Sequence, residues 1–242
     1  MNKIAKYICI IIIFLCLILI STSLDVYLNT DSLVSIITKI CITIICIVII
    51  RKENILKEKN KTTSEDIAVA LIPMTFSILL IFGPINKMPN TYVIISGVLG
   101  AFTTAVWEEL SYRVIGTKAF EDENEKLNSK SVILLCLLFG FSHAINIILK
   151  PNEILIELFR IILSTAVGSL FLALYLKTRN IKLSILSHFL LNYVTLFFKT
   201  FSTTPNYLGY IAYDVIYYLS VITYFVISWY IFRRYDLLSK DK

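Results

Sequence analysis

The sequence predicts an all-α polytopic membrane protein, a single bundle of eight membrane-crossing helices. Of its 242 residues, 57% are hydrophobic and only 17% are charged, with a mean hydropathy of +0.77. Soluble domains are richer in charge, at roughly a quarter of their residues. Predominantly apolar runs long enough to cross about 30 Å of hydrocarbon recur along the whole chain. Lysine and arginine gather in alternate junctions between these runs, as they do in proteins that cross a membrane repeatedly.

The apolar runs define eight expected spans within one domain. The third and the seventh are short for membrane helices, and no internal repeat or low-complexity linker divides the chain. The most hydrophilic stretch, residues 51–66, is expected to be a solvated linker between the second and third spans. We expect the spans at residues 4–20, 33–50, 67–82, 92–112, 132–149, 154–176, 183–198 and 213–232, and a single domain over residues 1–242.

The distribution of positive charge predicts the orientation of the chain. With the amino terminus inside, all but five of the 23 Lys and Arg residues fall in cytoplasmic segments, where such residues are retained. Both termini are then cytoplasmic in a multi-pass protein of the cell membrane. The basic start before the first apolar run also resembles a secretory signal. We expect an uncleaved first helix, and cleavage would leave seven spans in the same orientation. The five exceptions are Lys87, Lys150 and Lys199 in outer segments and Lys39 and Arg160 within spans.

Composition also limits the partners of the chain. The net charge of +6 follows from the orientation signal, so the lipid bilayer is an expected partner and nucleic acid is not. The five cysteines all lie within expected spans and form no C-x-x-C pair, which argues against disulfides and against a thiolate metal site. The sequence does not predict an oligomeric state.

A cluster of ionisable side chains at the end of the fourth span is the strongest functional signal. Glu108, Glu109 and Arg113 would each cost roughly 2.5–3.5 kcal/mol at the centre of a lipid-exposed helix, so they must face protein, a partner or water. On an α-helix Glu109 lies one turn from Arg113, and Glu108 points about 100° away. Glu109 is expected to stay ionised and to orient the helix end with Arg113, which leaves Glu108 free to exchange a proton. The alternative is that all three only mark the wet end of the span.

The two histidines of the chain lie in the fifth and seventh spans. His143 follows Phe139 by one helical turn and His188 precedes Asn192 by one turn, so the members of each pair share a helix face. An imidazole and a carboxamide on one face provide two neighbouring hydrogen-bond donors. A lone membrane histidine is more often a helix-to-helix hydrogen-bond partner than a catalyst, and that interpretation of His143 stays open here.

Side chains from these three spans can be combined into one hydrolytic site on the cytoplasmic side of the membrane. Glu108 and His143 could share a water molecule and take its proton, which makes a nucleophile without a covalent intermediate. His188 and Asn192 could then hold the oxyanion of the attacked carbonyl, a contribution of roughly 2.7–4 kcal/mol per donor in soluble proteases. The expected depths of the two water-activating side chains in the membrane agree less well. Glu108 lies about 6 Å inside the cytoplasmic end of its expected span, and His143 lies roughly 17 Å inside that of its own span.

Three motifs follow one another on separate expected helices: Glu-Glu-x-x-x-Arg at Glu108, Glu109 and Arg113, Phe-x-x-x-His at Phe139 and His143, and His-x-x-x-Asn at His188 and Asn192. In this order they resemble the motifs of the CPBP family, which comprises CAAX prenyl proteases and bacteriocin-processing enzymes and is also called the Abi family. The motif-bearing core covers residues 97–198. The resemblance implies an eight-helix intramembrane peptidase fold with a cavity open to the cytoplasm. It also implies that the first glutamate and first histidine activate water, and that the second histidine and the asparagine form the oxyanion hole.

The expected function is therefore an intramembrane endopeptidase that cuts a peptide bond near the cytoplasmic membrane face. Its expected substrate is a membrane-associated or lipidated peptide or protein, and no cofactor is expected. Strong use of isoleucine and lysine suggests an AT-rich bacterial genome. That origin favours peptide maturation or bacteriocin self-immunity over the tail trimming performed by eukaryotic members of the family.

Three other functions stay open. A zinc metallopeptidase would need three protein ligands, which Glu108, His143 and His188 could supply, although the sequence contains no H-E-x-x-H. A transporter could relay protons through the same groups, but the missing internal repeat counts against it. In a non-catalytic scaffold or immunity protein, these groups would only hold the bundle together.

Overall fold

The computed structural model is all-helical and describes residues 2–28, 32–55, 62–81, 91–149, 151–201 and 209–238. Eight long helical segments follow one another, as the sequence predicts. Over the described ranges no sheet forms, and β contact is limited to an isolated bridge between Leu127 and Leu238. The elements are α1 (Lys3–Leu28), α2 (Leu33–Lys52), α3 (Ser64–Ile81), α4 (Thr91–Glu108), η1 (Glu109–Ile115), α5 (Gly116–Phe120), α6 (Ser129–Ser142), α7 (Ile145–Leu149), η2 (Pro151–Glu153), α8 (Ile154–Thr178), α9 (Ile181–Phe201) and α10 (Gly209–Arg234).

Within the described residues, six helices are long and apolar enough to cross a membrane, which indicates a multi-pass membrane protein. The two expected spans that are not among the six are the two that are short in the sequence, at residues 67–82 and 183–198. Within the described residues, α9 contains a shorter apolar helix over Ile181–Leu196. Residue 82 lies outside the described residues. The six candidates are Lys3–Leu28, Leu33–Lys52, Thr91–Phe120, Ser129–Leu149, Pro151–Thr178 and Val215–Arg234.

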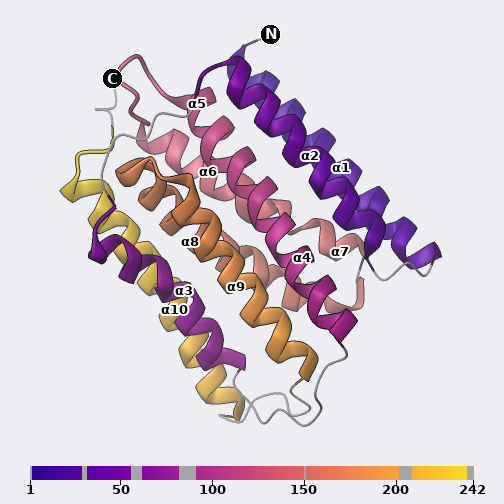
Figure 1. Cartoon of the computed structure of the whole chain (residues 1–242). Coiled ribbons are helices and arrows are strands. Elements are labelled where there is room, and N and C mark those ends of the chain that lie inside the picture. The colour runs from indigo at the N-terminus through magenta and orange to yellow at the C-terminus, as the bar shows by residue number, and fades with distance from the viewer. Residues whose placement is uncertain are drawn as a thin grey trace.

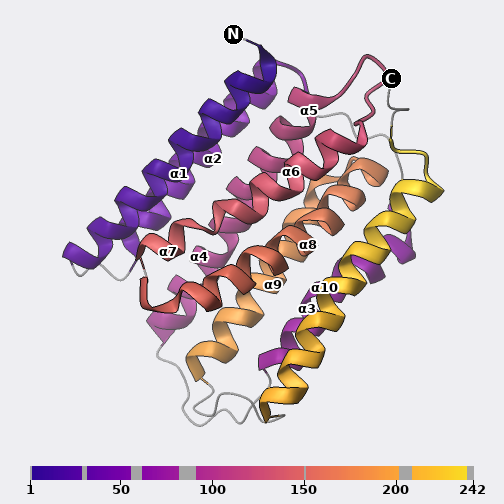
Figure 2. The same ribbon diagram turned by 180° about the vertical axis from the view of Figure 1, so that it is seen from behind.

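The second half of α8 lies in the core of the bundle, with every residue from 166 to 176 buried. α6 and α10 pack on α8, α3 and α4 pack on α9, and the hairpin of α1 and α2 lies against α4 and η1 (Figures 1 and 2). Glycines permit the closest approach of α6 to α8. A Cβ on Gly140 would lie 1.9 Å from Oγ1 of Thr165, and one on Gly168 would lie 2.6 Å from the Phe139 ring. This packing holds the α6 segment that carries Phe139 against the core.

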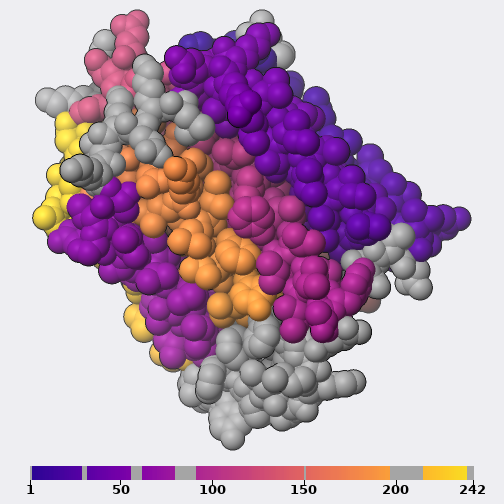
Figure 3. Space-filling model, in the orientation of Figure 1, coloured from indigo at the N-terminus to yellow at the C-terminus, as the bar shows by residue number. Residues whose placement is uncertain are grey.

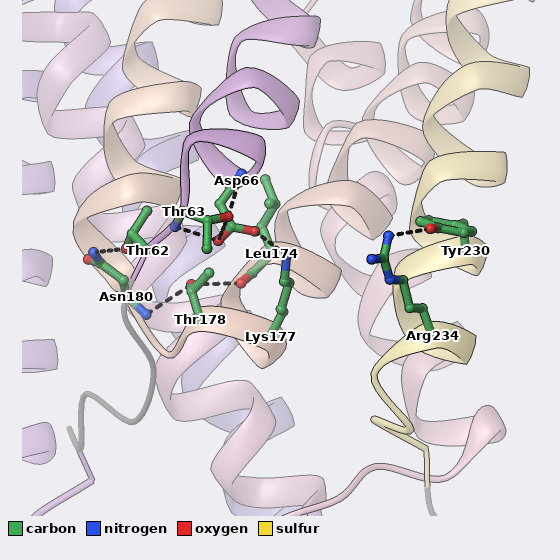
Figure 4. A network of polar contacts seen from close by, with 9 residues as sticks. All are labelled: Thr62, Thr63, Asp66, Leu174, Lys177, Thr178, Asn180, Tyr230 and Arg234. Carbon is green, nitrogen blue, oxygen red and sulfur yellow. Dashed lines mark hydrogen bonds and ion pairs between the residues drawn. The ribbon is translucent and has the colours of Figure 1, made fainter.

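Ion pairs tie several helices together at one end of the bundle. The start of α3 is fixed to the end of α8 by Asp66, which accepts hydrogen bonds from Lys177 and from the Thr63 backbone (Figure 4). Two further pairs, Arg179 with Glu121 and Lys126 with Asp236, connect the segments that follow α5, α8 and α10. Lys126, Lys177 and Arg179, all predicted to be cytoplasmic, therefore lie at one end of the bundle, which we call the basic end. Among the cations used to predict the orientation, Lys57, Lys59, Lys61, Lys87, Lys150, Lys240 and Lys242 lie outside the described residues.

Candidate active site

The fourth expected span does not end at Tyr112 but continues as helix to Phe120. After α4 the chain forms η1, a π-helix over Glu109–Ile115, and then α5. Such turns are rare in proteins and occur frequently at functional sites. All seven residues of η1 are buried, with Glu109 0% and Arg113 1% exposed. The alternative that the charged cluster marks the wet end of the span is therefore wrong.

Glu109 and Arg113 form a buried ion pair. Nε of Arg113 lies 3.3 Å from Oε2 of Glu109, the contact that their four-residue spacing predicts. The Arg113 guanidinium also lies over the Phe139 ring, 4.3 Å from its centroid. Removing two charges from water costs several kcal/mol for each ion, and the mutual attraction together with the aromatic ring offsets part of that cost. Phe139 thus supports the cation of this pair from α6.

His188 on α9 lies between the two glutamates. Its Nδ1 donates to Oε1 of Glu109 at 2.9 Å, and its Nε2 is 3.7 Å from Oε2 of Glu108. The imidazole is buried and packs on Phe171, with ring centroids 5.3 Å apart and an interplanar angle of 31°. Glu109 and Phe171 therefore fix the ring so that Nε2 faces Glu108. Oε2 of Glu108 is buried and has no hydrogen-bond partner among the described residues, so it is available to a water molecule or a substrate.

The fifth expected span is interrupted at His143. α6 ends at Ser142, and the chain turns through His143 and Ala144 before α7, so the span at residues 132–149 contains two helices rather than one. Nδ1 of His143 lies 3.3 Å from the carbonyl oxygen of Phe139. The Phe139 ring contacts both histidines, with centroids 5.6 Å from His143 and 5.9 Å from His188. Glu108 and His188 are close enough to His143 for electrostatic interaction with its ring.

The depths of Glu108 and His143 agree once the observed helix ends are used. Glu108 lies twelve residues before the end of α5, about 18 Å at 1.5 Å per residue. His143 lies fourteen residues from the start of α6, about 21 Å by the same measure. The mismatch expected from the sequence arose because both helices extend further toward the basic end than their apolar runs indicate.

Asn192 lines a cavity of about 480 Å³ between α2, α4 and α9. On the face shown in Figure 3, α4 is visible between α2 and α9. Thr104 also lines the cavity, and because Thr104 and Asn192 are each one turn from Glu108 and His188, the cavity ends beside the site. The Asn192 carboxamide is half-buried and makes no hydrogen bond within the described part of the chain. The structure thus brings His188 against both glutamates and leaves Asn192 facing the cavity.

Some features of this site are not evident from the sequence. Phe171 is one of 15 phenylalanines, and no spacing relates it to His188. The hydrogen bond from His188 to Glu109 joins two helices that are distant in sequence. The four-residue spacing predicts only the other partner of Glu109, Arg113. The pairing of an acid with an imidazole was a usable signal, but nothing in the sequence indicates which glutamate each histidine contacts.

The proposed zinc ligands can be compared with the observed donor geometry. Across the described ranges, no group of three or more His, Cys, Asp or Glu side chains is arranged to hold a metal ion. Glu108, His143 and His188 therefore do not form one ligating group in this structure, and Nδ1 of His188 is engaged by Glu109.

The central part of the chain resembles a known protein family. Residues 89–194 match the family model described as Rce1-like, type II CAAX prenyl endopeptidase. The matched stretch contains every site residue predicted from the sequence, and it extends from just before α4 into α9. α1, α2, α3 and α10 lie outside it. No curated protein and no solved structure matches the chain.

Proposed function

Because residues 89–194 match the model of the Rce1-like type II CAAX prenyl endopeptidase family, a family of peptidases, we propose that the chain is an intramembrane endopeptidase. It hydrolyses a peptide bond near the cytoplasmic membrane face, using water activated by Glu108 and His143. The observation that carries the proposal is the buried contact of His188 with both glutamates inside the matched domain. The active unit is a single domain over residues 1–242, with the site-bearing core at residues 97–198.

Water activation is assigned to Glu108 and His143. The unpartnered Oε2 of Glu108 accepts a proton from water while His143 orients that water from the α6 side. The oxygen then bonds to the carbonyl carbon of the substrate, and the proton passes to the nitrogen of the leaving amine when the C–N bond breaks. This route needs no covalent intermediate on the enzyme.

The oxyanion that forms on the attacked carbonyl is assigned to His188 and Asn192. In the protonated imidazole both ring nitrogens donate, Nδ1 to Glu109 and Nε2 toward the oxyanion. The Asn192 carboxamide supplies a second donor from one turn further along α9. Donors held in place before the reaction stabilise the transition state without reorganisation, by roughly 2.7–4 kcal/mol each in soluble proteases.

The remaining motif residues are assigned positioning roles. Glu109 holds the His188 ring, Arg113 neutralises Glu109, and Phe139 supports Arg113 and separates the two histidines. We assign the substrate to membrane-associated or lipidated peptides or proteins. The cellular role is assigned to peptide maturation or bacteriocin self-immunity, and the site opens to the cytoplasm.

The test is the replacement Glu108→Gln, which removes the proton acceptor and keeps the shape of the side chain. Membrane peptides from cells with the wild-type and the variant protein are compared by mass spectrometry. We expect equal amounts of folded protein and the accumulation of one uncleaved precursor in the variant. The matched control is Glu123→Gln in the exposed loop after α5, which should leave the peptide pattern unchanged.

Two results would contradict the proposal. Identical peptide patterns in the wild type and the Glu108→Gln cells would mean that Glu108 does not support hydrolysis. A phenotype that survives the substitution would favour a scaffold or immunity role. Exhaustive chelation of metal ions distinguishes the proposed reaction from the zinc alternative. The proposed reaction persists without metal, whereas a metallopeptidase loses activity.

A further inference from the structure

A cation on α2 faces the cavity next to the proposed site and has no part in the hydrolytic steps above. Lys39 is half-buried in the middle of α2 and lines the cavity. A charged side chain within a membrane helix is costly and points to a partner of opposite charge. The Lys39 ammonium makes no hydrogen bond or ion pair with any described residue, although Glu108 and Asp25 interact with it electrostatically over a longer range.

The packing of α2 against α4 and η1 fixes the level of Lys39 in the bundle. Sγ of Cys46 on α2 lies 3.3 Å from Oγ of Ser111, and α2 and α4 run in the same direction (Figure 1). Lys39 and Thr104 each lie seven residues before this contact and are therefore at about the same level. Thr104 is one turn before Glu108, so Lys39 lies about 6 Å from the level of Glu108 along the bundle axis.

The cavity provides space for an extended peptide along α4. At Gly100, which lines it, an added Cβ would meet nothing within 4 Å. At Gly97 a Cβ would meet Leu196 at 3.0 Å, so α4 and α9 come together at that level. The open part of the cavity thus lies between Gly97 and the site, on the same stretch of α4 that faces Lys39.

We propose that Lys39 binds a carboxylate of the substrate peptide and thereby determines which peptide bond reaches Glu108. This inference rests on the function proposed above and adds a specificity determinant from outside the matched domain. An extended peptide spans about 3.3–3.6 Å per residue, so a carboxylate on Lys39 places a bond two or three residues away beside Glu108 and Asn192. The carboxylate belongs either to the carboxyl terminus of the peptide or to an Asp or Glu side chain.

Binding can be measured separately from cleavage in the Glu108→Gln protein. The probe is a dansylated apolar hexapeptide in detergent micelles, followed by fluorescence anisotropy, with a free or an amidated carboxyl terminus. We expect the free acid to bind roughly ten- to hundredfold more tightly than the amide. Adding Lys39→Met should remove this difference, and Lys39→Arg should keep it. An amidated hexapeptide with Asp near its end distinguishes the two sources, since it regains tight binding only if a side-chain carboxylate suffices.

Two controls separate Lys39 from general effects of charge and folding. Lys130→Met removes an exposed cation at the start of α6 and should leave the acid-over-amide preference unchanged. Gly100→Leu fills open space and should weaken the binding of all probes while the protein stays folded. Equal binding of acid and amide, no binding of either, or a preference that survives Lys39→Met overturns the proposal. A Lys39-dependent preference in a protein whose wild type cleaves nothing would refute the proposed function, and with it the role of Lys39 in selecting a bond, while carboxylate binding by Lys39 would stand.

Discussion

At the scale of single residues, the two adjacent glutamates have different environments although they are neighbours in sequence. Glu109 is fully buried and contacts both Arg113 and His188. Glu108 faces His188 at 3.7 Å and keeps a carboxylate oxygen without a hydrogen-bond partner among the described residues. Glu109 is therefore held by two partners, whereas Glu108 keeps an oxygen open to water or substrate. This difference predicts that equivalent substitutions at the two positions will have different effects.

We expect Glu109→Gln to destabilise the protein by about 3–5 kcal/mol, because it leaves the Arg113 guanidinium buried without its anion. The double variant Glu109→Gln with Arg113→Gln should regain much of that stability. It should still cleave slowly, with a lower kcat and a similar KM, because His188 lacks its charged acceptor. The measurements are denaturation in detergent and single-turnover cleavage. If the double variant cleaves as fast as the wild type, Glu109 has no positioning role.

A matched control for the charge effect is Glu53→Gln. Glu53 is exposed, and its carboxylate lies 3.9 Å from the Lys6 ammonium. Exposed pairs contribute little to stability because water and ions screen them, so this variant should unfold as the wild type does.

At the scale of helices, the site depends on close contact between α6 and α8. Gly140 lies two residues before the end of α6, between Phe139 and His143. A Cβ at this position would meet Oγ1 of Thr165 at 1.9 Å and the carbonyl oxygen of Ile161 at 2.9 Å. The second contact is with backbone, which cannot rotate away. The position of His143 is therefore set by a glycine that has no chemical role.

We expect Gly140→Ala to push α6 away from α8, to destabilise the protein by about 1–3 kcal/mol and to slow cleavage by displacing His143. The stability control is the same substitution at Gly100, where a Cβ meets nothing within 4 Å. Thermal unfolding in detergent compares the two variants. Equal unfolding temperatures would show that the contact between α6 and α8 is more adaptable than the structure indicates.

At the scale of the whole molecule, the sequence predicts the helices and the motif residues better than it predicts their arrangement. Hydropathy identifies eight segments because lipid requires a continuous apolar surface. It misplaces the end of the fourth, because residues 113–117 are buried by protein contacts rather than by lipid. The contact of Glu109 with His188 depends on how α4, η1 and α9 pack together. Local spacing predicts the pair of Glu109 with Arg113 because both belong to one helix.

The orientation of the chain in the membrane is predicted from where its basic residues lie. Lys177, Arg179, Lys126 and Lys6 lie at one end of the bundle, where they pair with acidic residues, and membrane insertion retains such clusters on the cytoplasmic side. Glu123 in the loop after α5 and Asn152 in η2 are both exposed and lie at opposite ends of helices that lead to the site. We expect Glu123→Cys to react with an impermeant maleimide only after the cells are permeabilised. Asn152→Cys should react in intact cells, and labelling of the wild-type cysteines gives the background.

The labelling pattern decides from which side water and substrate reach the site. Labelling of Glu123→Cys in intact cells would place the basic end outside. The site would then open away from the cytoplasm, and its substrates would be extracytoplasmic peptides. Labelling of both variants in intact cells would place both positions on the outer side of the membrane. The chain between them would then cross the membrane an even number of times, so α6 and α7 would not together form one span. The expected pattern instead requires the segment of α6 and α7, which is long and apolar enough to cross a membrane, to span the bilayer between the two positions.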